Sequence, residues 1–229
     1  MNNLSIGLQI LKRRRAVDLG LAREFLSIPV ANVSDGMSRL VAGGPRLRRL
    51  HRGGRMAGPA LTVKTRPGDN LMILKALSLS RPGDVIVVDG GGDLTNALMG
   101  EIMLGEAVQR RLGGLVIHGA VRDAEAIAAQ ADMPVFACGV THRGPYKDGP
   151  GEINVPIALD GMVIEPGDLV IGDDDGVLGV PIDAVEGLLH WAREKQAVEA
   201  KMVRDLEDGV FDRPWVDETL SRLKCHIEA

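Results

Sequence analysis

The sequence of 229 residues predicts an α/β fold, a layered α-β-β-α sandwich around a barrel-like β core with extra N- and C-terminal helices. Three observations support this prediction. Apolar runs alternate with helix-compatible segments between residues 60 and 138, which is typical of α/β proteins. Short β-like runs then follow one another without helices between them. An amphipathic segment at the start and a charged segment near the end supply the extra helices.

In the first half of the chain, helices and strands are expected to alternate. Helix starts are placed where an Asp, Ser or Thr side chain can accept hydrogen bonds from free backbone amides. The expected elements, in order, are a helix over 8–27, a short helix capped by Ser34 or Asp35, a strand at Ala60–Lys64, a helix from Asp69 to about Ser80, a strand at Val85–Val88, a helix from Thr95 to about Leu112, a strand at Leu115–His118, a helix at Asp123–Ala131 and a strand at Pro134–Cys138.

The second half is expected to be mostly β and to end in helices. A charged helix runs from about Asp183 to Asp208, and a last short helix follows it. The β-like runs before it lie at 153–158, 162–164, 169–171 and 177–180.

A short repeat accompanies these strands. Pro-Gly-Asp occurs at 67–69, 82–84 and 166–168, and the last two copies each lead into an apolar strand with an acidic, glycine-rich end. Proline fixes φ at one turn position, and glycine supplies the positive φ that a type II turn needs next. The repeat suggests two similar β-units that close on one core.

The chain is expected to form a single domain over residues 1–229. Residues 1–30 hold the N-terminal helix, and residues 183–229 form a helical extension at a subunit interface. The tail carries Phe211, Pro214 and Trp215, which favour packing on a neighbouring subunit or on the core.

Composition excludes several classes of function. The net charge is −4, and aromatic residues are too few for stacking on nucleic-acid bases. The basic spots at Lys12–Arg15 and Arg46–Arg55 indicate a solvated or salt-bridged face. Cys138 and Cys225 form no disulfide framework or zinc spacing. No apolar run reaches membrane-spanning length and no signal peptide is recognisable, so we expect a cytoplasmic protein without nucleic-acid or membrane partners.

The glycine-rich turn at 85–97 does not match a nucleotide-binding motif. Its sequence, VIVVDGGGDLTNA, places Thr95 where the dinucleotide fingerprint needs its last glycine. It also lacks the Gly-Lys-Ser/Thr of a P-loop. Such a turn can still offer backbone amides to a smaller anion, such as a carboxylate.

Arg122 and Asp123 follow an apolar strand and precede a helix, which is where α/β folds place ligands. A carboxylate at a helix N-terminus stays ionised and suits a hard divalent cation. A guanidinium offers a planar fork to a carboxylate or a developing oxyanion. Adjacent residues do not pair easily, so a simple surface ion pair is an incomplete explanation, and both interpretations stay open on these residues alone.

Two other segments are candidates. Glu101 lies in a helix-compatible segment among apolar neighbours, so it faces either solvent or a site. The connection at 141–154 is dense in charges and donors, including His142, and is either a cover over a site or a plain surface loop. The lone histidines, His118 among them, are interpreted as structural or solvated.

The sequence resembles a family of class II pyruvate aldolases within the larger group that contains the regulator of ribonuclease activity A. The resemblance covers roughly residues 30–200. It rests on the segments TRPGDNLMILKAL, RPGDVIVVDGGGDLTNALMGEIM, GGLVIHGAVRDAEAI, PVFACGVTHRGPYKDGPGEINVPI and PGDLVIGDDDGVLGVP.

The resemblance implies roles for individual residues. It implies that Asp123 holds Mg²⁺ or Mn²⁺, that Arg122 contacts the pyruvyl oxygen, and that Glu101 acts on the metal through water. It further implies substrate binding by Asn70 and by the backbone near Met99 and Gly100. Glu199 of a neighbouring subunit is the best match for a further carboxylate near the metal, although Glu194 and Glu207 lie on the same predicted helix.

The implied activity is metal-dependent cleavage of 4-hydroxy-4-methyl-2-oxoglutarate, of 4-carboxy-4-hydroxy-2-oxoadipate, or of both, in the degradation of aromatic compounds. Oxaloacetate decarboxylation would accompany it, and the enzyme would be a homotrimer or homohexamer. Two positions depart from the family pattern. The family often has an acidic residue where this chain has His118, and a histidine where it has Leu74, which leaves substrate preference open.

Three alternatives remain. A Schiff-base aldolase would need a desolvated lysine, with Lys64, Lys75 or Lys147 as candidates. A non-catalytic regulator that binds a ribonuclease would share the scaffold. A methyltransferase is the third, and would show itself by cofactor binding.

Overall fold

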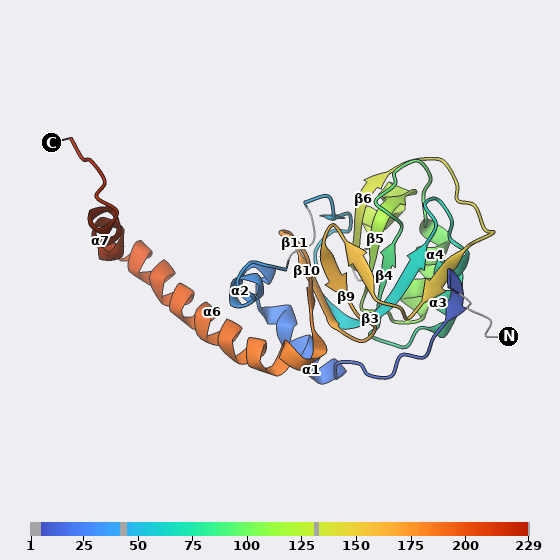
Figure 1. The fold of residues 1–229 in the computed structure, drawn as a ribbon, viewed down its shortest axis with the longest axis horizontal. Coiled ribbons are helices and arrows are strands. Elements are labelled where there is room, and N and C mark those ends of the chain that lie inside the picture. Colours follow the sequence, from blue (N-terminus) through green and yellow to red (C-terminus); the bar gives the residue numbers. More distant parts are fainter. Residues whose placement is uncertain (1–5, 42–44, 131–132, 229) are drawn as a thin grey trace. The chain divides into compact units, whose positions relative to one another are not determined.

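The computed structural model describes residues 6–41, 45–130 and 133–228 (Figure 1). The chain divides into two compact units, with the boundary between Ala192 and Arg193. The first unit holds all the strands of the described residues. The second holds the rest of the long helix α6 and the helix α7. None of the described helices combines the length and the apolarity that crossing a bilayer requires.

The strands form one large sheet and a separate hairpin. The main path runs β1-β7-β3-β4-β5-β6-β2; β10 pairs with β3 and with β11, while β8 and β9 pair with each other. The strands are β1 (Leu8–Ile10), β2 (Arg48–Arg49), β3 (Met56–Thr65), β4 (Val85–Asp89), β5 (Gly114–Val121), β6 (Val135–Val140), β7 (Gly151–Ile153), β8 (Ile157–Leu159), β9 (Met162–Ile164), β10 (Leu169–Asp173) and β11 (Gly176–Val180).

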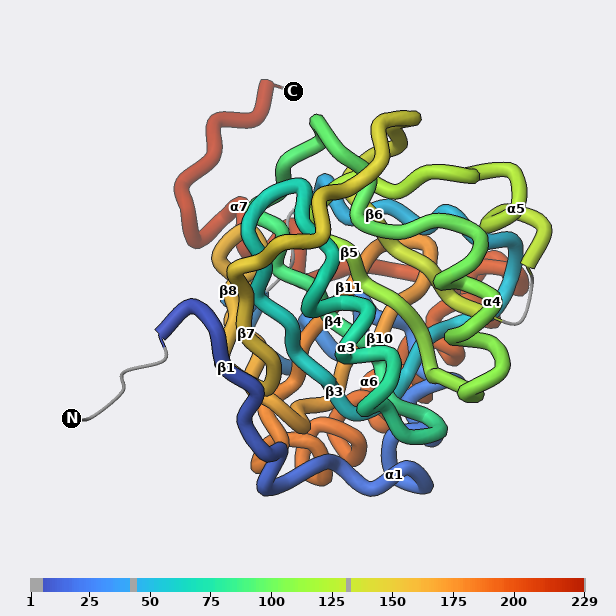
Figure 2. Tube along the Cα trace, turned by 90° about the vertical axis from the view of Figure 1, so that its right-hand side faces the viewer, coloured from blue at the N-terminus to red at the C-terminus, as the bar shows by residue number. Residues whose placement is uncertain are grey.

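Strand β3 belongs to both β layers. Its first residues, Met56–Pro59, pair antiparallel with β10, whereas Ala60–Lys64 pair parallel with β4. The chain therefore passes from one layer into the other within a single ten-residue strand. Strands β4, β5 and β6 continue the parallel part, and Figure 2 shows β1 and β7 beside β3 at its edge.

Helices cover the outer face of each β layer (Figure 1). Helices α3, α4 and α5 pack on the main sheet, and α1, α2 and the start of α6 pack on β10 and β11. The helices are α1 (Leu19–Glu24), the 3-10 helix η1 (Phe25–Ser27), α2 (Val30–Gly36), α3 (Leu71–Leu79), α4 (Glu101–Gln109), α5 (Ala124–Ala129), the 3-10 helix η2 (Ile182–Ala184), α6 (Val185–Glu207) and α7 (Pro214–Arg222).

The side-chain alternation of the strands produces this layering, because successive residues of a strand face opposite sides. In β4, Ile86 and Val88 join the cluster under α3 and α4, whereas Val85 and Val87 join the cluster between the two β layers. Both faces of β4 and β5 are buried, as expected for parallel strands covered on both sides. The predicted α/β class with its α-β-β-α layers is confirmed.

The predicted helix over 8–27 is wrong in its first half. Leu8–Ile10 forms strand β1, paired in parallel with Gly151–Ile153 of β7. The helix begins only at Leu19, where the Asp18 side chain accepts a hydrogen bond from Leu21 N at 3.0 Å. A pairing partner 143 residues away in the chain decided the conformation of the first segment, so local periodicity could not reveal it.

Two further helix starts differ from the prediction. Ser34 and Asp35 lie in the last turn of α2, which instead begins after Pro29. Its first amide, Val30 N, donates to Asp173 Oδ2 at 2.9 Å, so the cap comes from strand β10. The predicted helix from Thr95 begins only at Glu101.

The other predicted elements agree with the structure to within a few residues. The run at 153–158 is divided between β7 and β8, and α5 covers 124–129, while residue 131 lies outside the described residues. The Pro-Gly-Asp turns form as predicted, with φ of +77° at Gly68, +86° at Gly83 and +95° at Gly167.

Candidate active site

The candidate site lies where the parallel strands β4 and β5 end and the chain turns toward α4 and α5. After β4, residues 90–100 run without helix to the start of α4. Leu98 N donates to Ala120 O of β5 at 2.8 Å, and Arg122 N donates to Met99 O at 2.9 Å. These two bonds hold the segment that carries Met99 and Gly100 against the segment that carries Arg122.

Asp123 lies at the N-terminus of α5 and contacts the N-terminus of α4. It occupies the N-cap position of α5 with a left-handed backbone, φ 57° and ψ 43°. Its side chain makes no capping bond to α5, contrary to the usual expectation for this position. Instead, its Oδ2 accepts a hydrogen bond from Glu101 N, at the start of α4, at 2.9 Å. The free amide and the positive end of the α4 dipole both attract negative charge at this position.

Gly100 makes this approach possible. A Cβ at position 100 would overlap Asp123 Oδ2 and lie 2.9 Å from Arg122 Cγ. Real Cβ atoms do not come so close to other atoms, so a side chain here would push the Arg122–Asp123 turn away from α4. The absence of a side chain at Gly100 therefore sets the geometry of the site.

Arg122 and Asp123 contact each other, although neighbouring residues were not expected to pair easily. Arg122 Nε lies 3.7 Å from Asp123 Oδ2, because the left-handed turn folds the carboxylate back toward the guanidinium. The side chains are 43% and 41% exposed, so both charged groups remain open to a ligand.

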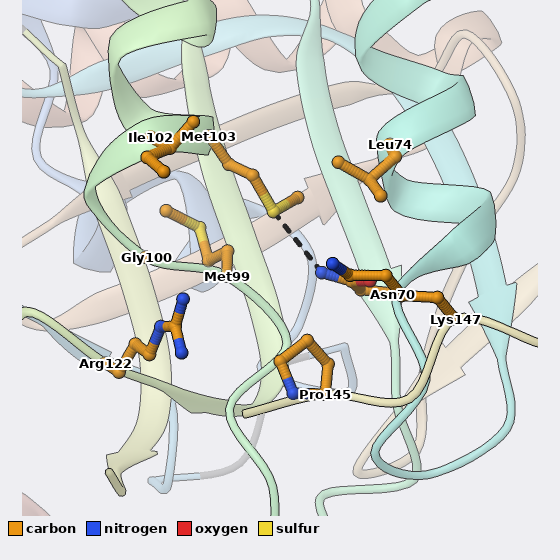
Figure 3. Close-up of a pocket in the computed structure, with 9 residues that line it drawn as sticks. All are labelled: Asn70, Leu74, Met99, Gly100, Ile102, Met103, Arg122, Pro145 and Lys147. Carbon is orange, nitrogen blue, oxygen red and sulfur yellow. Dashed lines mark hydrogen bonds between the residues drawn. The ribbon is translucent and has the colours of Figure 1, made fainter. Parts of the chain in front are cut away.

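A small pocket of about 150 Å³ opens beside Arg122 (Figure 3). It brings together four residues that were predicted for this site and five others. Of the five, Lys147 was named only as a Schiff-base candidate and Leu74 only as a departure from the family pattern. Predicted are Asn70, Met99, Gly100 and Arg122; not predicted as site residues are Leu74, Ile102, Met103, Pro145 and Lys147. Pro145 and Lys147 belong to the 141–154 connection, so part of that loop lines the pocket.

Asn70 brings an unsatisfied acceptor to the pocket. The residue is 3% exposed, and its Nδ2 donates to Leu98 O at 3.1 Å and to Met103 Sδ at 3.5 Å. Among the described residues, its Oδ1 has no hydrogen-bond partner. A buried oxygen without a partner is costly, and a ligand that donates to it would remove that cost.

Buried Asp69 anchors the covering loop. Its Oδ2 accepts hydrogen bonds from Asp148 N and Gly149 N, each at 2.8 Å. Asn70 N also donates to Tyr146 O at 3.0 Å. The backbone on both sides of Lys147 is therefore hydrogen-bonded to the residues that precede α3. His142, in the same loop, is exposed and does not line the pocket.

The remaining predicted residues lie outside the pocket lining. Glu101 and Asp123 directly follow Gly100 and Arg122 in the chain, and these two residues do line the pocket. Glu199 lies in the second unit, where its Oε1 is 3.1 Å from Lys195 Nζ. Nowhere in the described part of the chain do three or more His, Cys, Asp or Glu side chains gather closely enough to hold a metal ion.

His118 is buried and belongs to a separate network that includes the more exposed residues Arg46 and Asp160. Its Nε2 lies 3.0 Å from Asp160 Oδ1 and from an Arg46 nitrogen, and its Nδ1 lies 3.5 Å from Asp89 Oδ1. Contact with Asp89, and then with Asp160, raises the pKa of His118 in spite of its burial. The histidine is therefore structural, as one of the two interpretations held, and ties the β8–β9 turn to the ends of β4 and β5.

Comparison with known proteins identifies the family of this chain. Residues 30–178 match the RraA-like family, described as Aldolase/RraA. A provisionally named 4-hydroxy-4-methyl-2-oxoglutarate aldolase of Halalkalibacterium halodurans is 39% identical over 194 residues, covering 85% of this chain and 92% of that protein.

Solved structures of other proteins are also similar to this chain in fold. An uncharacterised protein from Pseudomonas syringae pv. tomato has a TM-score of 0.75 at 25% identity, covering 85% of this chain and 95% of its own. The RNA-processing inhibitor RraA from Thermus thermophilis has a TM-score of 0.61 at 31% identity, covering 67% of this chain and 92% of its own. The chain therefore belongs to the RraA-like family of aldolases and RraA proteins.

Proposed function

We propose that this protein is a divalent-metal-dependent pyruvate aldolase. Its substrates would be 4-hydroxy-4-methyl-2-oxoglutarate, 4-carboxy-4-hydroxy-2-oxoadipate, or both. The observation that carries the proposal is the Arg122–Asp123 turn, half exposed beside a small pocket that also collects Asn70, Met99 and Gly100. The name of the Halalkalibacterium halodurans relative supports the same reaction class.

The donor set fits magnesium or manganese. The Asp123 carboxylate is open to solvent and held at a helix N-terminus, and Glu101 follows the neighbouring glycine. Mg²⁺ commonly binds through one or two carboxylates and keeps its other positions for water and substrate oxygens. Few protein ligands are therefore needed, and Glu199 of a neighbouring subunit would add one. When bound, the ion would supply Lewis-acid polarisation of the substrate's keto and carboxylate oxygens.

The substrate's pyruvyl half would lie against Met99, Gly100 and Arg122. The backbone that precedes α4 would bind its carboxylate, because amides at a helix start have no partner within the helix. The Arg122 guanidinium would donate to the pyruvyl oxygen. Such a donor, placed where negative charge develops, lowers a barrier by about 3–4 kcal/mol in comparable enzymes.

Cleavage would break the bond between C3 and C4. The C4 hydroxyl loses its proton, C4 becomes the carbonyl carbon of one product, and the bonding electrons move to C3 to give the enolate of pyruvate. Glu101 would accept the hydroxyl proton through water, and the enolate then takes a proton at C3. Oxaloacetate would give the same enolate on losing carbon dioxide, so we expect decarboxylation as a side activity.

Pyruvate release tests the proposal directly. Both hydroxy-oxo acids and oxaloacetate are supplied to the protein with and without added magnesium, and after treatment with EDTA. We expect release that requires the ion. Release that survives EDTA, together with covalent trapping of pyruvate by borohydride, would instead identify a Schiff-base lysine such as Lys147.

The side chain of Asp123 provides the residue-level test. Asp123→Ala removes the proposed metal ligand, and Asp123→Asn keeps an acceptor for Glu101 N while removing the charge. We expect both variants to fold and to lose metal-dependent turnover. Asp183→Ala is the matched control, since Asp183 is exposed and pairs with Arg15 outside the pocket. Wild-type turnover in the folded Asp123 variants would overturn the assignment.

A second candidate is a regulator of RNA processing, favoured by the similarity to the Thermus thermophilis inhibitor. If the protein has this function, the wild type should slow ribonuclease-catalysed RNA decay. The Asp123→Ala variant should slow it equally well. The match to the aldolase-named relative covers 85% of this chain at 39% identity, whereas the match to the inhibitor covers 67% at 31% identity. The higher identity over a longer stretch supports the aldolase as the first choice.

A further inference from the structure

The pocket has a charged side and an apolar side. Among the described residues that line it, Arg122 and Lys147 are the charged ones, both are cationic, and none is a carboxylate. Leu74, Ile102 and Met103 supply apolar surface, and Figure 3 shows Leu74 and Met103 across the pocket from Arg122. The pocket therefore offers two positive charges and one apolar wall.

Core packing fixes the apolar wall. Leu74 lies one turn after Asn70 on α3, with Leu74 N bonded to Asn70 O at 3.0 Å, so the two side chains share a face of the helix. Leu74 is half-buried and packs against the core under α3 and α4, and Met103 belongs to that core. Because both side chains are held by the interior, this wall cannot easily move away from a ligand.

The two candidate substrates differ only in what they would present to this wall. Both carry a pyruvyl carboxylate and a second carboxylate on C4. The third substituent on C4 is a methyl group in one and a carboxymethyl group in the other. With the pyruvyl carboxylate on the backbone before α4 and Arg122 on the pyruvyl oxygen, Lys147 is the cation left for the C4 carboxylate that both acids share. The third carboxylate of the larger acid then has no cation among the described lining residues. An unpaired carboxylate against an apolar surface is strongly unfavourable.

We propose that Leu74, together with Met103, selects substrates with an apolar substituent at C4 and rejects those with a third carboxylate. The proposal rests on the aldolase function proposed above and names its specificity determinant. The small volume of the pocket, about 150 Å³, acts in the same direction. Pockets for drug-sized ligands are usually larger, about 300–1,000 Å³.

The expected preference is measurable as a ratio. We expect kcat/KM for 4-hydroxy-4-methyl-2-oxoglutarate to exceed that for 4-carboxy-4-hydroxy-2-oxoadipate by at least about tenfold. Discrimination by one substituent in a hydrophobic pocket is typically about 10–200-fold. A ratio of the two constants does not depend on the fraction of active protein, so partial unfolding of a variant leaves it interpretable.

Leu74→Lys is the decisive variant. It brings an ammonium group to the wall, which would pair with the third carboxylate, so we expect the ratio to fall about tenfold or to invert. Leu74→Met keeps the wall apolar and should keep the preference. Leu79→Lys places the same charge on the same helix at an exposed position outside the pocket lining, and should change neither constant.

The outcomes separate this inference from the proposed function. If the wild type cleaves both acids equally well, or if Leu74→Lys leaves the ratio unchanged, the selectivity proposal is wrong while the aldolase stands. If the wild type cleaves neither acid in the presence of magnesium or manganese, the aldolase proposal itself fails, and the selectivity proposal fails with it.

Discussion

At the scale of single residues, Arg122 shows how backbone conformation prepares a side chain for chemistry. The left-handed turn at Asp123 brings the carboxylate to 3.7 Å from Arg122 Nε, and both groups stay partly exposed. A guanidinium in this position keeps its further N–H donors for a ligand oxygen. The fork geometry, rather than the positive charge alone, is what the proposed reaction would use.

Arg122→Lys should therefore be severe. We expect kcat for pyruvate release to fall by on the order of 10²–10³, because a single ammonium cannot replace a two-pronged donor at the enolate oxygen. Arg110→Lys is the matched control, since Arg110 makes an ion pair with Glu106 on α4 at 2.8 Å and does not line the pocket. A kcat close to that of wild type would contradict the proposed role of Arg122.

His118 is a residue whose charge should stabilise the fold in a pH-dependent way. Its pKa is raised above 6.5, first by its contact with Asp89 and then by Asp160. The contact with Arg46 lowers the pKa of Asp160, with a further contribution from His118. Because the folded state holds the His118 proton more tightly than the unfolded state, the stabilisation is fully present below about pH 6.5 and is lost as pH rises through the folded-state pKa.

The measurement is denaturant unfolding at a series of pH values from 6 upward. We expect the free energy of unfolding of the wild type to fall through this range. In His118→Gln, which cannot take up the proton, that fall should be reduced. His142→Gln is the control, because His142 is exposed on the 141–154 loop and outside this network. Equal pH slopes for wild type and His118→Gln would show that the network is not protonated in the folded protein.

At the scale of elements, the late start of α4 determines the site. Residues 95–100 would have been a helix on local propensity, but Ala97 bridges Ala120 of β5, and Leu98 N bonds to Ala120 O. Helix α4 consequently begins at Glu101, whose amide is then free to bind Asp123. Had the helix begun at Thr95, that amide would have been bonded within the helix.

Gly100→Ala tests this junction. The added Cβ would overlap Asp123 Oδ2, so the turn must shift, and we expect a loss of stability of about 1–3 kcal/mol with a larger relative loss of turnover. Gly105→Ala on α4 is the matched control. Nothing lies within 4 Å of a Cβ there, so it should stabilise the helix by roughly 0.5–1 kcal/mol and keep activity. Equal turnover in the two variants would contradict the role of Gly100.

At the scale of the whole molecule, the second unit leaves apolar side chains exposed. Val198, Met202 and Leu206 on α6 and Trp215 on α7 are each more than two-fifths exposed in the single chain. Exposed apolar surface of this kind commonly marks a protein interface. It supports the proposal that this unit packs on a neighbouring subunit. An assembly of three or six chains, with Glu199 acting in a neighbouring subunit's site, is the form that we propose.

Subunit complementation tests that proposal. Asp123→Ala and Glu199→Gln should each lower turnover on their own. When the two variants are co-expressed, mixed oligomers would contain some sites with both native side chains, and we expect part of the activity to return. Light scattering should give the mass of three or six chains of 24.4 kDa. A monomer, or inactive mixed oligomers, would exclude a shared site.

The sequence by itself determined the local order of this protein. Apolar runs and turn residues located strands β3 to β6 and β9 to β11, and the strand-to-helix change located Arg122 and Asp123. The family resemblance pointed to Asn70, Met99 and Gly100, which the structure places in one pocket. The strands and the Arg122–Asp123 turn depend on residues close together in the chain, so a local pattern carries that information.

The tertiary structure decided what depends on residues far apart in the chain. Strand β1 forms because β7 pairs with it, α4 starts late because β5 holds residues 97 and 98, and Lys147 reaches the pocket because Asp69 anchors its loop. Leu74 faces the pocket for the same reason, through the packing of α3 beside α4. Such contacts leave no local periodicity, because their free energy comes from partners that only the folded chain brings together.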